Sequence, residues 1–133
     1  MTFGYIREQV LFQTQNDADD LEDYQPAIDD YINEGYDRLI YAYTGMHLDE
    51  TNDSETTIPY PSMSDVRDEP KLPKWTHRAI ADYATYLMYR NGNALKQSRG
   101  VPYYNAFMEV LNKLPYAKKG GMKFKNLFVE KVF

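Results

Sequence analysis

The sequence has no cysteine among its 133 residues. This absence excludes disulfide bonds, thiolate metal sites and thiol nucleophiles, and it fits a reducing compartment. Long apolar runs are also missing, because charged or amide residues interrupt every stretch well short of the roughly 18–20 apolar residues that span a bilayer. Arg7 and Glu8 fall where a secretory signal would have to be apolar. We therefore expect neither a membrane protein nor a secreted one.

Histidine is scarce, and recognisable catalytic motifs are missing. His47 and His77 are the only histidines, lie 30 positions apart and have no HExxH motif around them. The chain also lacks a phosphate-binding glycine loop and a GxSxG nucleophile turn. We predict no enzymatic activity, no cofactor and no metal. The alternative that stays open is a divalent-metal enzyme that uses both histidines and nearby carboxylates.

The residues that are present suit one folded domain. A length of 133 residues is typical of a single domain, and 43% hydrophobic residues are enough for a core. Tyrosine supplies 13 of the aromatic side chains, against 6 phenylalanines and 1 tryptophan. Because a tyrosine ring is apolar and its hydroxyl needs a partner, these residues suit the rim of a core or a protein interface.

The two halves of the chain carry opposite charge. Residues 1–70 hold 17 acidic and 3 basic side chains, whereas residues 71–133 hold 12 basic and 3 acidic ones. One interpretation is that the acidic half lies against the basic half within a single fold. The other is a head-to-tail oligomer, in which the acidic face of one subunit meets the basic face of the next.

Apolar residues at helical spacing predict four helices. The first covers 3–14, and the second has Pro26 in its first turn and stops at Gly45. The third opens at Pro73 and the fourth at Pro102, and residues 94–99 can add a helical turn between them. The single tryptophan is expected to anchor the core. The predicted core consists of Ile28, Ile32, Leu39, Trp75, Ile80, Tyr83, Leu87, Phe107 and Leu111.

Two segments do not fit a helix. Residues 46–72 form a long, acidic, Pro-rich loop, in which 58–63 can dock as an extended piece. After Gly120 and Gly121, apolar residues alternate roughly as in a strand that needs a partner. The predicted fold is therefore mainly α: a small bundle of about four helices over 1–116, followed over 117–133 by an extended C-terminal arm able to form a β-strand.

The arm combines lysines with aromatic residues. This combination suits contact with a phosphate backbone or with bases, but lysines on an edge strand equally serve to prevent aggregation. The chain is acidic overall, with a pI near 5.0, which argues against a sequence-specific nucleic-acid binder.

Two helical segments separated by a loop, and then a last helix, follow one another in a distinctive order. The two segments are YINEGYDRLI and LPKWTHRAIADYATYLMYR, and the last helix is VPYYNAFMEVLNKL. Over about residues 3–114 this order resembles the head-to-tail connector, or adaptor, proteins of tailed bacteriophages. The N-terminal helix and the segment after Pro115 match that family in kind only.

The resemblance implies a structural virion protein at the head–tail interface, assembled in the host cytoplasm. Its subunits would form a dodecameric ring that docks on the portal protein, contacts the next neck or tail protein, and lets double-stranded DNA pass without sequence-specific recognition. The helices around Leu39 and Trp75 would form the subunit core, and acidic residues of the 47–69 loop would line the channel or face the next ring. The implied portal-docking arm contains Lys118, Lys119, Lys123, Phe124, Lys125, Phe128 and Phe133.

A second reading of the same residues is a small helical regulator or inhibitor that binds one protein and uses the acidic half as a DNA mimic. Such a protein would be a monomer or a dimer. A ring-forming adaptor would instead assemble into a larger oligomer.

Overall fold

A computed structural model describes residues 1–48 and 60–121, and this part of the chain is mainly helical, with no β-strand. The predicted helical bundle is thus confirmed. None of the described helices is both long and apolar enough to cross a membrane. The long helices are α1 (Phe3–Gln13), α2 (Ile28–Thr44), α3 (His77–Arg90) and α4 (Ala94–Leu111). Short helical turns are η1 (Gln15–Asp17), η2 (Glu22–Ala27), η3 (Lys74–Thr76) and η4 (Ala117–Gly121).

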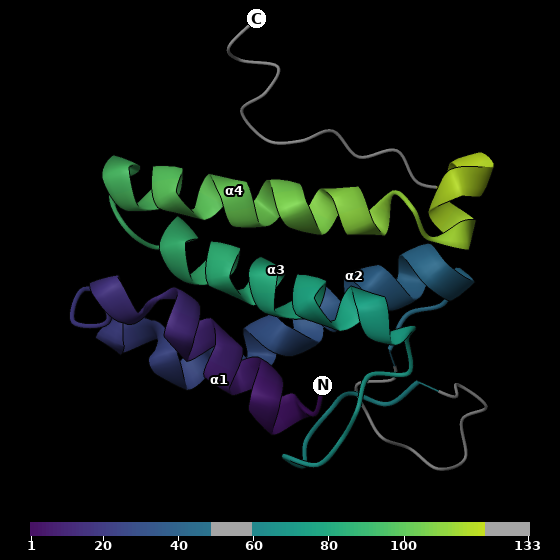
Figure 1. Ribbon diagram of the computed structural model, residues 1–133, viewed down its shortest axis with the longest axis horizontal. Helices are drawn as coiled ribbons and strands as arrows, with labels where there is room; N and C mark the ends of the chain where they lie inside the picture. The colour runs from purple at the N-terminus through teal and green to yellow at the C-terminus, as the bar shows by residue number, and fades with distance from the viewer. Residues whose placement is uncertain (49–59, 122–133) are drawn as a thin grey trace, which may run out of the picture.

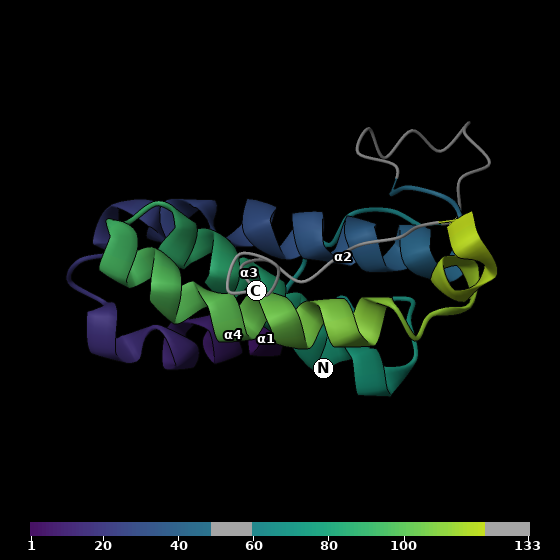
Figure 2. The ribbon, with the colours of Figure 1, turned by 90° about the horizontal axis from the view of Figure 1, so that it is seen from above.

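The long helices run alternately up and down, and α3 lies among the other three. Figure 1 shows α4 along one side of α3, with α1 and α2 along the other. Figure 2, seen from above, places α1 and α2 on opposite flanks of the α3–α4 pair. α3 packs against all three partners, most extensively against α4. Its alanines, Ala79, Ala81 and Ala84, are completely buried, and their small side chains let the neighbouring helices approach closely.

Eight of the nine predicted core residues are buried. They come from α2, α3 and α4, and α1 adds Phe3, Ile6 and Val10 to the same cluster. The tyrosines follow the expectation for a core rim: Tyr36 and Tyr89 are buried, whereas others pack half-exposed against the cluster. The buried predicted residues are Ile28, Ile32, Leu39, Ile80, Tyr83, Leu87, Phe107 and Leu111.

Trp75 is the exception, and its assignment to the core was wrong. Its side chain is 56% exposed. The segment after Pro73 begins with the tight turn η3 rather than with a regular α-helix. In this turn Thr76 and the following His77 point inward, at 0% and 2% exposure, and Trp75 points outward. The turn changes the angle between successive side chains, so the helical spacing used for the prediction does not apply there.

The predicted bounds of α1 and the predicted end of α2 agree with the structure to within a residue, whereas the starts of α2, α3 and α4 differ. Gly45 ends α2 in the left-handed conformation, with φ of +79°, as expected of a C-terminal glycine. Pro26 lies in η2, just before α2 rather than inside it. α4 begins at Ala94, where the Asn93 side chain accepts a hydrogen bond from the backbone N–H of Lys96, so Pro102 lies within the helix instead of opening it.

The predicted loop 46–72 is described over 46–48 and 60–72, and its second part is fastened to the bundle. Met63 is buried, and its backbone exchanges two hydrogen bonds with the Asn33 side chain, at 2.8 and 2.9 Å. The backbone N–H groups of Phe3 and Gly4 donate to carbonyls of this segment at 2.7 and 2.9 Å. Docking as an extended piece is therefore seen at Met63, while 49–59 lies outside the described residues.

The first residues of the predicted C-terminal arm are helical rather than extended. η4 contacts α2, and Ala117 is 7% exposed. Tyr116, just before it, packs edge-on against Tyr41, with ring centroids 5.3 Å apart. Residues 122–133, with the predicted strand, lie outside the described residues.

The closest helix contact predicts a stability effect. A Cβ atom added to Gly100 on α4 would lie 2.9 Å from Cβ of Tyr89 on α3. Overpacking of this kind costs about 1–3 kcal/mol, whereas alanine gains about 1 kcal/mol over glycine in a helix. Gly100→Ala should therefore lower the free energy of unfolding by up to about 2 kcal/mol in urea titrations. The exposed Ser98→Ala in the same helix is the control, and should be neutral or slightly stabilising.

Buried His77 predicts a pH dependence. Its Nε2 atom lies 3.0 Å from the Leu72 carbonyl, and its Nδ1 atom lies 2.9 Å from the Met1 amino group. Burial lowers the pKa of His77 below its usual 6.5. On acidification the unfolded chain therefore binds a proton at His77 before the folded protein does. The free energy of unfolding is undiminished above pH 6.5 and falls as the pH decreases from 6.5 toward the folded-state pKa.

Melting temperatures between pH 7.5 and 5.5 test this expectation. His77→Gln should remove most of the decline that the unmodified protein shows in this window. His47→Gln, which keeps the buried ring, should leave the decline in place. An unchanged slope in His77→Gln would assign the pH dependence to other groups.

Candidate interaction surfaces

A buried carboxylate joins the two charged halves of the chain. Asp17 of η1 is 6% exposed and accepts hydrogen bonds from Tyr89 at 2.7 Å and from Lys96 at 2.5 Å. Arg99 also pairs with it, and Lys96 reaches Asp20 at 2.8 Å. The hydrogen bonds from Lys96 and Tyr89 hold the pKa of Asp17 below its usual range. The first interpretation of the charge split, contact within one fold, therefore holds at this cluster.

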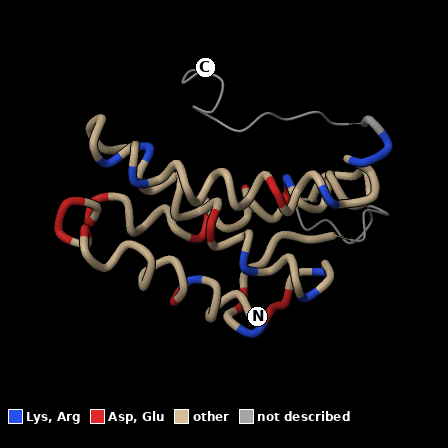
Figure 3. The backbone as a smooth tube through the Cα atoms, turned by 45° about the horizontal axis from the view of Figure 1, so that its top comes forward, with Lys and Arg blue, Asp and Glu red and all other residues tan. Residues whose placement is uncertain are grey.

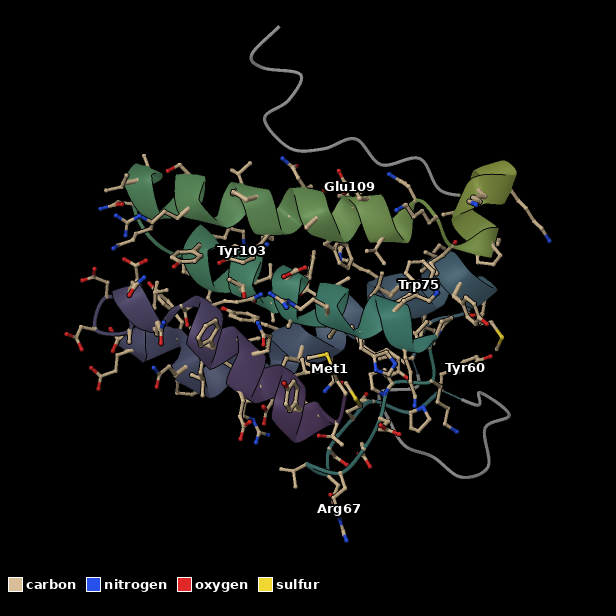
Figure 4. All side chains as sticks on the ribbon, viewed as in Figure 1. Met1, Tyr60, Arg67, Trp75, Tyr103 and Glu109 are labelled. Atoms are coloured by element: carbon tan, nitrogen blue, oxygen red, sulfur yellow. The ribbon has the colours of Figure 1, made fainter. Side chains whose placement is uncertain are left out.

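A cleft of about 540 Å³ lies beside the Asp17 cluster. Tyr103, labelled on α4 in Figure 4, is part of its lining. Deeper in the bundle, the Gln13 side chain donates to Asp82 at 3.0 Å and accepts from Thr85 at 2.6 Å. Burial raises the pKa of Asp82. The charged groups around the cleft bind one another, an arrangement that fastens α1 to α3 and α4.

The outer side of α2 carries a row of carboxylates. Asp30, Glu34 and Asp37 line a shallow groove of about 540 Å³. Asp37 accepts from the backbone N–H of Leu48 at 2.7 Å and lies 3.0 Å from Nδ1 of His47. The His47 ring stacks on Tyr41 with centroids 4.3 Å apart. The groove therefore presents negative charge to solvent along about two helical turns.

The two histidines bind separate partners: His47 contacts Asp37, and His77 contacts Met1 and Leu72. Within residues 1–48 and 60–121, no three ligand side chains are grouped so that they could hold a metal ion.

Figure 3 shows an acidic turn at one end of the bundle and basic residues at the other, and residues of the opposite charge also lie near each end. At one end, the turn between α1 and α2 exposes Asp19, Glu22 and Asp23. At the other end, the segment that leads into α3 exposes Lys71 and Lys74. Neither set forms an ion pair in the part of the chain that the structure describes. Charge is thus available for contacts with other molecules at both ends.

Two of the seven predicted arm residues can be placed. Lys118 and Lys119 are exposed on η4, at the same end of the bundle as the beginning of α3. The other five lie outside the described residues. They are Lys123, Phe124, Lys125, Phe128 and Phe133.

The Asp17 cluster was not predicted from the sequence. Asp17 opens a run of acidic residues that read as a solvated turn, and its partners lie about 80 positions away, at Lys96 and Arg99. A weak signal was present, because these two cations are three residues apart and therefore share one face of a helix.

No family model matches the chain, and neither a curated protein nor a solved structure matches it. The resemblance to phage adaptors therefore rests on the residues of this chain alone.

The Asp17 cluster predicts an asymmetric response to mutation. Asp17→Asn should lower the melting temperature at pH 7 clearly more than Asp20→Asn, because Asp17 is buried with three donors, whereas Asp20 is 66% exposed and binds only Lys96 among the described residues. Because the pKa of Asp17 is lower in the folded protein than the usual 3.8, its carboxylate stabilises the fold above pH 3.8. This contribution to the free energy of unfolding is lost as the pH falls through the folded-state pKa. The gap between Asp17→Asn and the unmodified protein should therefore narrow below pH 4. Equal melting temperatures for the two variants at pH 7 would contradict a structural role for the cluster.

Proposed function

We propose that this protein is a non-enzymatic adaptor subunit of a tailed-phage neck, which docks on the portal and joins the capsid to the neck or tail. The observation that carries the proposal is the position of the C-terminal segment. The bundle closes its own core, and η4 then leaves from one end with Lys118 and Lys119 exposed. A basic segment at the end of a closed body is suited to hold a second protein.

The charged groups of the bundle also favour a binding role. In the Asp17 cluster each ionised group is committed to a structural contact, and the cleft beside it is lined by the same residues. Along α2, in contrast, Asp30 is exposed and Glu34 and Asp37 are half-exposed, although Glu34 pairs with Arg38 and Asp37 contacts His47. A wall of negative charge repels the DNA backbone, which would let DNA pass without adhering.

A second function is favoured by the same row of carboxylates. Asp30, Glu34 and Asp37 recur at roughly one-turn spacing on α2, and a regular line of negative charge is what a protein that imitates the DNA backbone requires. Under this alternative the chain is a small inhibitor of a DNA-binding protein. It would bind that protein competitively with DNA and would have no affinity for a portal.

Copurification with a portal protein from the same phage tests the adaptor function. The full-length protein should bind the portal, and electron microscopy should show a ring on it. A chain ending at Gly121 should bind at least ten-fold more weakly while keeping its helical content and melting temperature, because the truncation spares the buried Ala117. Lys113→Ala, an exposed lysine before η4, is the matched control and should bind normally.

Three results would contradict this assignment. Absence of portal binding by the full-length protein would exclude the adaptor function. Normal binding by the truncated chain would show that residues 122–133 are not needed for docking and would place the docking surface within residues 1–121. Metal-dependent turnover that disappears in the double variant His47→Ala, His77→Ala would identify an enzyme instead.

A further inference from the structure

The exposure of Trp75 needs an explanation, because burying an indole ring is among the most favourable contacts available to a protein. Figure 4 shows the ring at the N-terminal end of α3, on the outside of the bundle. Lys71, Lys74 and Arg78 around it in the sequence are exposed as well. We call Lys71, Lys74, Trp75 and Arg78 the basic end. It combines an aromatic ring with positive charge, which is the composition of an interface anchor.

The opposite end of the bundle carries the complementary set. Phe12, in the last turn of α1, is 62% exposed, and the chain continues from there into the turn with Asp19, Glu22 and Asp23. We call these four residues the acidic end. It too combines an exposed aromatic ring with exposed charge, but the charge is negative. At the basic end Arg78 is paired with Asp82, so Lys71 and Lys74 supply the positive charge that forms no ion pair among the described residues.

These two patches cannot meet within one molecule. α1 and α3 run in the same direction, and the acidic end follows the C-terminus of α1, whereas the basic end precedes the N-terminus of α3. Figures 1 and 2 place them at opposite ends of the long axis. Their complementarity in charge and in aromatic surface can therefore be satisfied only between molecules.

We propose that the basic end of one copy docks on the acidic end of a second copy, with Trp75 as the apolar anchor. The pairing is head-to-tail, so a pair of copies still has one free basic end and one free acidic end, and repeated pairing produces a closed ring or an open filament. This inference rests on the proposed function in that it supplies the contact between neighbouring subunits of the adaptor ring. The head-to-tail interpretation of the charge split then applies to the two end patches, whereas contact within one fold applies at the Asp17 cluster.

Charge-swapped variants of the full-length protein test the pairing. Lys71→Glu with Lys74→Glu makes both ends acidic, and Asp19→Lys with Glu22→Lys and Asp23→Lys makes both ends basic. Each variant alone should sediment as a monomer at concentrations at which the unmodified protein associates. An equimolar mixture should regain association, because the acidic variant can then pair with the basic one.

Trp75→Ala should weaken self-association at least ten-fold without changing the melting temperature. Val66→Ala, at a residue that is 53% exposed and belongs to neither patch, is the matched control and should associate normally. Association of the unmodified protein should also weaken as salt rises from 50 to 500 mM, because exposed charges are then screened within a few ångströms.

Several results would overturn the pairing. Self-association that survives both charge swaps places the interface elsewhere, and portal binding measured on the same variants would then show that the adaptor function stands without this contact. A mixture that stays monomeric refutes complementarity. A protein that is monomeric both alone and with the portal refutes the ring. If retention of double-stranded DNA, rather than self-association, is lost in Lys71→Glu with Lys74→Glu, the basic end is a nucleic-acid surface.

Discussion

The burial of α3 is the constraint on which the rest of the structure depends. This helix contacts α1, α2 and α4, and most of its residues are buried. A helix buried on nearly all sides cannot carry large side chains everywhere, and Ala79, Ala81 and Ala84 occupy positions where neighbouring helices approach. Gly100 of α4 and Gly35 of α2 serve the same purpose from the partner helices, since each lies against a tyrosine of α3. Close packing around one central helix therefore determines the arrangement of the other three.

Polar side chains hold the outer elements to this centre. The Asp17 cluster ties the end of α1 to α3 and α4, and the hydrogen bonds between Asn33 and Met63 tie the loop segment to α2. These bonds are buried or half-buried, so losing one partner leaves the other without a replacement from water. They also consume charge that would otherwise be free: Lys96 and Arg99 are committed to Asp17. The charges that remain exposed, at the two ends and along α2, are the ones available for partners.

Much of the fold could be predicted from the sequence, because helical spacing of apolar residues is a local property. The stripe of apolar residues on α2 predicted the helix, and Gly45 predicted its end. Eight of the nine predicted core residues are buried. The prediction was wrong where local chemistry departs from regular α-helix. η3 turned Trp75 outward, and Asn93 started α4 well before Pro102. In both places a short-range hydrogen-bonding choice outweighed the pattern of apolar residues.

The sequence by itself determined the helical class, the core stripes and the opposite charge of the two halves, since each depends on neighbouring residues or on composition. Only the tertiary structure decided which charges neutralise each other. Asp17 and Asp19 stand two positions apart in the same acidic run, yet one is buried against Lys96 and the other is exposed. That difference follows from the position of η1, which places Asp17 beside Tyr89 of α3 and Lys96 of α4, about 80 positions away in the sequence for Lys96. A linear pattern cannot separate them, because burial depends on which distant surface covers each side chain.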